Sequence, residues 1–448
     1  MKQKFPALVG LLLCCTFIHA QTINYEKTLE KTKALAIRDK KPIAILITIK
    51  PMTASPNFMK GLTDPDVITK FNMGFINYKI AKEDTETSEK IISEYKVTRF
   101  PALVFLDDKG GLLFKDVAAS PWAAPLLTMA DKVFAGMSDM SLVDYDVKFK
   151  GGNNEKDFIK KYILKRQTAG LSDNADLIEN YVNSLSVSDL NNYEEVLFIL
   201  KAGPVTDSNA FKLARTNKKV IDSIFKHEPL SDRKTFNNAT IYNTLNKAIA
   251  SKNMTRAMAA ANFSRSTYGN NYTEGHRSMQ AIMLQYYLGA KDTMQYLRNA
   301  VSYFDNYYMT MSMDSVRKKD SFNFEAAKRN ATVIEEIKVD ENVIRRTSSF
   351  AYAKDTYATA LNNAAWNFFK LGGDSNEYLV KAMLWSKRSI EHNAKAAYYD
   401  TYAHILYKLK LYSEAETMQR KAIESAKSEK IDAAQYIREL EKIKNKSL

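Results

Sequence analysis

The pattern of hydrophobic and polar positions divides the chain into a segment of alternating strands and helices and a longer helical remainder. Within residues 21–138, continuous apolar runs at Ile43–Ile49 and Ala102–Leu106 are typical of strands that are covered on both faces. Stretches with helical spacing, at 25–39 and 86–95, separate such runs. We therefore predict an α/β domain over this segment.

Residues 139–345 show amphipathic helical patterns and no strand-like runs. Within it, we expect six or more helices between Glu155 and Val301. Glycine and proline predict helix breaks at Gly203-Pro204, Glu228-Pro229 and Gly269–Asn271, and Gly151–Asn154 has the composition of a linker.

The last part, residues 346–448, contains two similar helix pairs. Ala382 and Ala415 lie 33 residues apart in matching contexts, close to the period of tetratricopeptide repeats, which is about 34. We expect Ala382, Ala415 and Ala422 to be buried between helices. Helix pairs that stack side by side leave a concave groove. We predict that polar residues of the first helices line this groove, namely Asn362, Asn363, His404 and Lys408.

The first twenty residues have the features of a signal peptide. Lys2 and Lys4 precede an apolar run at 7–18, which is too short to span a bilayer comfortably, and Ala20 ends a small-residue cleavage motif. We predict cleavage after Ala20 and export to the periplasm or cell envelope. No later segment is apolar enough to predict a transmembrane span.

Cysteine content and charge exclude several functions. The two cysteines, Cys14 and Cys15, fall within the predicted signal peptide, so the remaining chain has no thiol for catalysis, zinc–thiolate binding or redox switching. The formal net charge is +14, but residues 21–140 hold 17 basic and 15 acidic residues, and no basic run exceeds three. Because a nucleic-acid-binding protein usually concentrates its charge on one face, we predict no nucleic-acid partner.

The segment from Tyr25 to about Val133 resembles the thioredoxin-like superfamily. The motifs that carry the resemblance are the apolar strand at 43–49, "DPDVITKFNMGFINYKIAKED" and "YKVTRFPALVFLDDKG", in which Pro101 occupies the position of the family's cis-proline. Together with the C-terminal helix pairs, the chain resembles thioredoxin-plus-repeat proteins exported by Bacteroidetes-type bacteria.

The resemblance implies a cis peptide bond between Phe100 and Pro101. It also implies that the loop formed by Arg99, Phe100 and Pro101 offers backbone groups to an extended peptide, since strand addition needs no thiol. The alternative is that Phe100 packs in the core and Pro101 only shapes a turn.

The family's redox chemistry is not expected here. That chemistry needs a thiolate at a helix N-terminus and a second cysteine three positions on. The corresponding loop contains no cysteine in any register and consists of Met52, Thr53, Ala54, Ser55 and Pro56. We predict no catalytic residue, no cofactor and no metal site.

Two groups of residues could be considered as metal ligands, but the sequence favours a packing role for the first and identifies no complete ligand set for the second. Methionines at 309, 311 and 313 suit copper, but methionine at such spacing is more often a packing residue. His392 and His404 have no third ligand that the sequence identifies.

The predicted function is a non-catalytic, extracytoplasmic binding or adaptor protein that recognises polypeptide. It would use a redox-inactive thioredoxin-like domain and a helical-repeat groove. The alternative is an accessory subunit or chaperone of a thiol–disulfide oxidoreductase whose cysteines lie on another chain. A hydrolase in the middle region finds no support in its motifs, and the oligomeric state stays open.

Overall fold

The computed structural model describes residues 22–49, 56–118, 120, 122–329, 333–339, 342–347 and 356–448. Its N-terminal part is a five-stranded sheet with the strand order β1-β3-β2-β4-β5. Strand β3 runs parallel to β1 and β2, whereas β4 is antiparallel to both β2 and β5. In chain order, the elements are β1 (Tyr25–Glu26), α1 (Leu29–Asp39), β2 (Ile43–Thr48), the 3₁₀ segment η1 (Pro56–Thr63), α2 (Pro65–Gly74), β3 (Ile76–Ala81), α3 (Thr85–Glu94), β4 (Ala102–Leu106), β5 (Leu112–Val117) and α4 (Ala123–Met137).

Helices cover both faces of the sheet, as the continuous apolar runs predict. Along β2, Ile43, Ile45 and Ile47 pack on one face with α1 and α3. Ala44 and Leu46 pack on the opposite face with α2 and α4. This alternation follows from the two-residue period of a strand, which sends successive side chains to opposite faces. The α/β prediction is confirmed, and the sheet has the thioredoxin-like fold.

The predicted cis-proline is also confirmed. The Phe100–Pro101 peptide bond is cis. The Asp64-Pro65-Asp66 sequence starts helix α2, in which Pro65 occupies the first turn and the Asp64 side chain accepts a hydrogen bond from the Asp66 backbone N–H. Proline suits the first helical position because its missing N–H would have no partner there.

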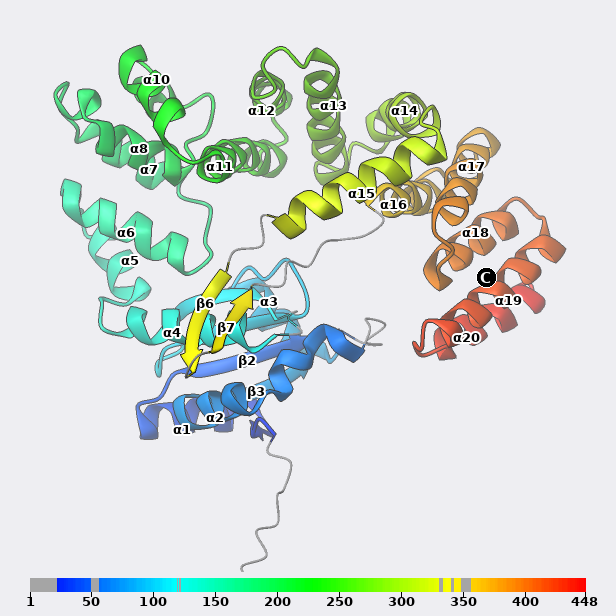
Figure 1. Cartoon of the computed structure of the whole chain (residues 1–448), viewed down its shortest axis with the longest axis horizontal. Coiled ribbons are helices and arrows are strands. Elements are labelled where there is room, and N and C mark those ends of the chain that lie inside the picture. The colour runs from blue at the N-terminus through cyan, green and yellow to red at the C-terminus, as the bar shows by residue number, and fades with distance from the viewer. Residues whose placement is uncertain are drawn as a thin grey trace, which may run out of the picture.

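The remaining chain is mainly helical, and its helices form an arch that begins beside the sheet and curves round to the C-terminal helices (Figure 1). Helix α15 crosses the inner side of this arch (Figure 1). The first elements are α5 (Leu142–Lys150), α6 (Lys156–Thr168), α7 (Ala175–Asn183), η2 (Asp189–Asn191), α8 (Tyr193–Ala202), α9 (Asn209–Leu213), α10 (Lys218–His227) and α11 (Leu230–Ala250). They are followed by α12 (Met254–Ser266), α13 (Tyr272–Gly289), α14 (Thr293–Phe304), the π-helical η3 (Asp305–Met309) and α15 (Met313–Arg329).

The predicted helix breaks occur where glycine and proline place them. Gly203 ends α8 with a φ of 77°, and a Cβ there would lie 2.7 Å from Asn243 Nδ2 of α11, so both its conformation and its contact require glycine. Gly151–Asn154, in contrast, is not a linker. Residues on both sides of it, Tyr145 and Ile159 among them, belong to one core, so the segment is a turn between α5 and α6.

One strand pair was missed by the sequence analysis, which expected no strands after about residue 140. Strands β6 (Val333–Val339) and β7 (Asn342–Thr347) form an antiparallel hairpin. Its register places Glu335 opposite Arg346 and Glu336 opposite Arg345. The hydrophobic alternation is short and lies between long helical patterns, which hid it.

Five helices complete the chain, and their bounds are α16 (Thr356–Leu371), α17 (Asn376–His392), α18 (Ala396–Lys408), α19 (Tyr412–Ser428) and α20 (Ala434–Lys444). Ala382, Ala415 and Ala422 are fully buried, as predicted. Small side chains at these positions let neighbouring helices approach closely. None of the helices in the described ranges is both long enough and apolar enough to cross a membrane.

Candidate functional site

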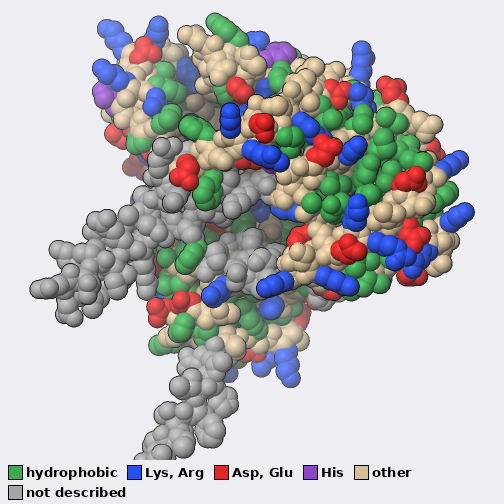
Figure 2. Space-filling view, turned by 45° about the vertical axis from the view of Figure 1, so that its right-hand side comes forward, with side chains coloured by type: hydrophobic (Ala, Val, Ile, Leu, Met, Phe, Trp, Pro, Cys, Tyr) green, Lys and Arg blue, Asp and Glu red, His purple; other side chains and the backbone are tan. Residues whose placement is uncertain are grey.

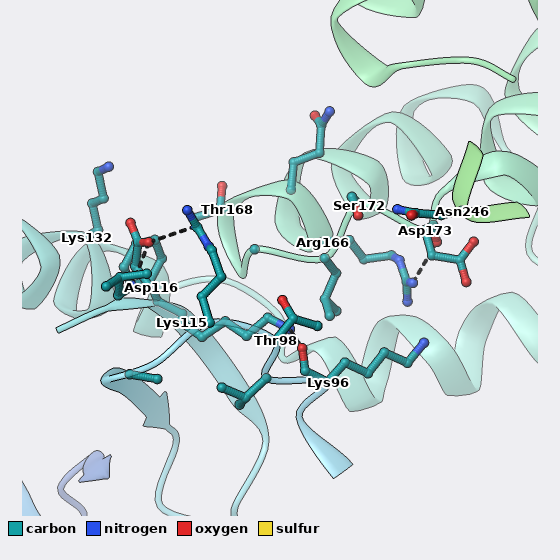
Figure 3. A pocket seen from close by; sticks show the side chains of 18 residues that line it. Lys96, Thr98, Lys115, Asp116, Lys132, Arg166, Thr168, Ser172, Asp173 and Asn246 are labelled. Carbon is teal, nitrogen blue, oxygen red and sulfur yellow. Dashed lines mark hydrogen bonds and ion pairs between the residues drawn. The ribbon is translucent and has the colours of Figure 1, made fainter. Parts of the chain in front are cut away.

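A cleft of about 520 Å³ lies between the thioredoxin-like domain and the first helices of the arch (Figure 3). We call it the junction cleft. Its walls come from the segment that leads into Pro101, from β5, from α4, from the turn between α6 and α7, and from α11. The lining residues are Lys96, Val97, Thr98, Arg99, Ala102, Phe114, Lys115, Asp116, Val117, Lys132, Arg166, Gln167, Thr168, Gly170, Leu171, Ser172, Asp173 and Asn246.

The outer edge of β5 forms one wall, and the turn after α6 lies against it. The Ala118 N–H donates to the Pro101 carbonyl, so the backbone groups of Ala118 face β4. In an antiparallel ladder the backbone groups of successive residues face opposite sides, and the carbonyl of Lys115, three residues earlier, therefore points away from β4. Gly170 meets this carbonyl: a Cβ at Gly170 would lie 3.0 Å from the oxygen. Gly170 also has a φ of 75°, and its N–H donates to the Gln167 carbonyl in the cap of α6. The turn therefore protects the edge strand at this point.

Two further contacts hold the walls of the junction cleft together. The buried Lys165 of α6 donates a hydrogen bond of 2.7 Å from Nζ to the Gly136 carbonyl of α4, and its Nζ lies 3.7 Å from Asp139 Oδ2. Leu112 of β5 packs against both the sheet core and the core of the first helices. The junction cleft is therefore built by packed elements on both sides.

The junction cleft is positively charged. Five of its lining residues are cationic and two are carboxylates. Arg99 Nη2 lies 3.3 Å from Asp116 Oδ1, between two exposed side chains. Among the residues that the structure describes, the other four cations form no ion pair; they are Lys96, Lys115, Lys132 and Arg166.

Neutral groups hold two of these four cations in place. Lys115 Nζ donates to the backbone carbonyls of Tyr95 and Lys96, at 2.6 Å and 2.7 Å. Burial lowers the pKa of Lys115, and repulsion by Lys96 lowers it further. Arg166 donates from Nε to Asn174 Oδ1 and from Nη2 to the Asp173 carbonyl. Carbonyl and amide oxygens position the cations but leave their charge unbalanced.

The three predicted peptide-loop residues have different environments. Arg99 is exposed and lines the junction cleft. Phe100 is half-buried, packs against the core beneath α1 and α3, and has Lys82 Nζ 4.8 Å from its ring centroid. Pro101 is buried. Phe100 and Pro101 thus make the packing contacts of the structural alternative, and a peptide-binding role for all three stays a prediction.

Most of the predicted degenerate active loop, Met52, Thr53, Ala54 and Ser55, lies outside the described residues. Pro56 is the first residue of η1, and this segment is tied to the chain before α4 by a hydrogen bond from the Gly61 N–H to the Ser120 carbonyl.

The predicted groove residues of the C-terminal helices are mostly engaged in packing. Asn362 and His404 are buried, Lys408 is half-buried and donates from Nζ to the Phe369 carbonyl, and Asn363 is exposed. A role in a ligand-binding groove stays a prediction for all four.

His404 itself lies among several partners. Its Nδ1 is 2.8 Å from the Asp400 carbonyl and its Nε2 is 3.5 Å from Glu439 Oε2, while Trp366 and Phe369 meet the ring edge to face. Burial raises the pKa of Asp400, and the neighbouring His404 opposes that shift. His404 of α18 thus contacts Glu439 of α20 and two aromatic rings of α16.

Sequence reasoning missed most of the residues that line the junction cleft. Lys115, Lys132 and Arg166 belong to no motif, and Lys96 lies in the motif before Pro101 without having been predicted as a site residue. Up to 70 residues separate the four along the chain. The nearest signal was Gly170, which follows the helical pattern of α6 as a C-terminal cap would.

Comparisons with known proteins add little to this picture. No protein-family model and no curated protein matches the chain. Three chains of solved structures match. One of them, titled "DsbH Oxidoreductase", is 19% identical, and the match covers 28% of this chain and 93% of that chain, with a TM-score of 0.23. The thioredoxin-like assignment accordingly rests on the strand order and the helices that cover both faces of the sheet.

Proposed function

We propose that the chain is a non-catalytic binding or adaptor protein of the cell envelope that recognises polypeptide. The observation that carries the proposal is the position of the loop before Pro101. In the thioredoxin-like fold this loop can offer its backbone to an extended chain. Here Arg99 of the loop opens onto the junction cleft, which the helical region completes.

The absence of cysteine from residue 16 onward removes the thiol that disulfide exchange requires. A serine or threonine hydroxyl would need an activating base. The histidines after the predicted cleavage point are His227, His276, His392 and His404, and none of them lines the junction cleft. The residues around the cleft therefore suit binding rather than bond breaking.

The helical region would supply a second, larger surface. We propose that α16 to α19 form two tetratricopeptide-type repeats, with α20 as a closing helix. The burial of Ala382 and Ala415 at equivalent positions supports this assignment. Of the four predicted groove residues, Asn363 is exposed and is the groove contact that its exposure favours. The proposal includes export, with a signal peptide that is cleaved after Ala20.

A peptide array tests the proposed recognition. The purified full chain is incubated with an array of short peptides of varied composition, next to its Arg99→Ala variant. A variant with the exposed Met73 of α2 changed to alanine is the control. We expect the wild-type chain and the control to bind a common subset of peptides and the Arg99 variant to bind that subset several-fold more weakly. No peptide bound above background would contradict the proposal.

A redox assay tests the non-catalytic part. We expect insulin reduction by dithiothreitol to proceed at the same rate with and without the protein, because the chain has no thiol after residue 15. Faster reduction in its presence would refute this expectation. Peptide capture that occurred only with an added thiol oxidoreductase would favour the accessory role instead.

A further inference from the structure

We propose that the junction cleft binds an acidic segment of a polypeptide, with the carboxylates of that segment lying against Lys96, Lys115, Lys132 and Arg166. This inference rests on the proposed function and adds the chemical class of its ligand.

The distribution of charge is the first argument. Residues 21–140 carry an excess of only two positive charges, yet the part of this segment that lines the junction cleft has four cations and one carboxylate, an excess of three. The positive charge of the domain is therefore gathered at the cleft and not spread over its surface. On the face of the molecule seen in Figure 2, by contrast, basic and acidic side chains are interspersed.

The missing counter-charges are the second argument. Clustered like charges repel, and a cleft lined by one sign of charge raises the local concentration of an oppositely charged ligand. Within the described part of the chain, Lys96 and Lys132 are exposed and have no carboxylate partner. Lys115 and Arg166 are oriented by neutral oxygen atoms. The repulsion is thus left uncompensated until an anion binds.

The arrangement of the charges favours an extended acidic chain over a compact polyanion. In Figure 3, Asp116 lies toward one end of the junction cleft and Asp173 toward the other, with Lys96, Thr98 and Lys115 between them. Alternate side chains of an extended chain are spaced about 7 Å apart, so carboxylates can meet separate cations while the backbone amides face the two aspartates. A dense phosphate chain would be repelled by both carboxylates.

The test measures the binding of two fluorescent peptides to the full chain by anisotropy. One peptide alternates glutamate with neutral residues, and the other has glutamine in place of each glutamate. The cleft variant carries Lys96→Glu and Lys132→Glu. The matched control carries Lys27→Glu and Lys33→Glu, which change the net charge equally at exposed positions outside the junction cleft.

We expect the acidic peptide to bind at least about tenfold more tightly than the glutamine peptide, and the cleft variant to lose about tenfold of that affinity, because reversal turns attraction into repulsion at two rim positions. The control should change the affinity by less than about twofold at about 0.15 M salt, where distant charges are screened. A second cleft variant, with glutamine at both positions, should show an intermediate loss of affinity. It keeps the test valid if the glutamate variant misfolds, and circular dichroism checks the fold of both variants.

Several outcomes would overturn the inference. Equal affinity for the two peptides, or an equal loss of affinity in the cleft variant and the control, would show that the junction cleft does not bind acidic side chains. Displacement of the peptide by inorganic phosphate or polyphosphate at similar concentration would identify a site for small anions instead. If array peptides bind but the acidic peptide does not, the inference fails while the proposed function stands. If no peptide binds at all, both fail.

Discussion

Replacing Gly170 with alanine should weaken the docking of the helical region on the edge of the sheet. Two costs add at this position. A non-glycine residue in a left-handed conformation costs about 1–2 kcal/mol, and Gly170 has a φ of 75°. The new Cβ would also lie 3.0 Å from the Lys115 carbonyl oxygen and 3.2 Å from Lys115 Cγ, closer than ordinary van der Waals contact. Relief of that contact requires β5 or the turn to shift.

Gly152 supplies the matched control for this change. It also has a positive φ, of 92°, but a Cβ there would meet no atom within 4 Å. Gly152→Ala therefore reports the backbone cost alone. We expect Gly170→Ala to lower the free energy of unfolding by about 1 kcal/mol more than Gly152→Ala does, which is the cost of a modest steric adjustment in a packed interface.

Urea denaturation of the full chain measures the two variants against the wild type through the midpoint of the first transition. Hydrogen exchange adds a local readout, since opening of the junction should speed exchange at the amides of β5 and of the turn after α6 in Gly170→Ala only. Equal effects of the two substitutions, in both assays, would show that the turn is not packed against the edge strand.

Two further changes test neighbouring parts of the structure. Lys165→Met keeps an unbranched side chain that is one heavy atom shorter but removes the donor to the Gly136 carbonyl, so it should destabilise the chain by about 1–3 kcal/mol. The exposed Lys161→Met of the same helix should change stability little in the same denaturation series. A hydrogen bond from Lys156 and others from Ser186 lower the pKa of Asp189 from 3.8 to about 2. Because the folded form of Asp189 holds its proton less tightly than the unfolded form, this contribution to stability is complete above about pH 4 and is lost as the pH falls toward 2. Asp189→Asn should therefore flatten the decline of the melting temperature between about pH 4 and pH 2, and an unchanged slope would contradict the role of that hydrogen bond.

Much of the fold follows from local patterns that the sequence carries openly. The apolar run of β2 is buried on both faces because every second residue faces α1 and α3 while the others face α2 and α4. Gly203 and Pro229 lie at helix boundaries because each disfavours continuation of a helix. The β6–β7 hairpin was not predicted because its alternation of hydrophobic and polar residues is short. Its strands depend on pairing with each other, which a local pattern does not report.

Polar residues on helices were harder to assign. The sequence shows that Asn362 and His404 stand on helices, but an amphipathic pattern does not distinguish a polar residue that faces a groove from one that is buried against a partner. His404 is buried because Asp400 and Glu439 satisfy its ring nitrogens and aromatic rings enclose it. Those partners come from α16, α18 and α20, and only the packing of the three helices brings them together.

The sequence by itself determined that this thioredoxin-like domain has no thiol after residue 15, and it placed Pro101 before a central strand. The tertiary structure alone decided that cations from four separate segments meet beside that loop. Local propensity fixes the backbone of each segment, but proximity between segments depends on how their faces pack. In this chain it depends on Gly170 meeting the edge of β5 and on Lys165 meeting the end of α4, contacts that bring Arg166 and Lys115 into the lining of one cleft.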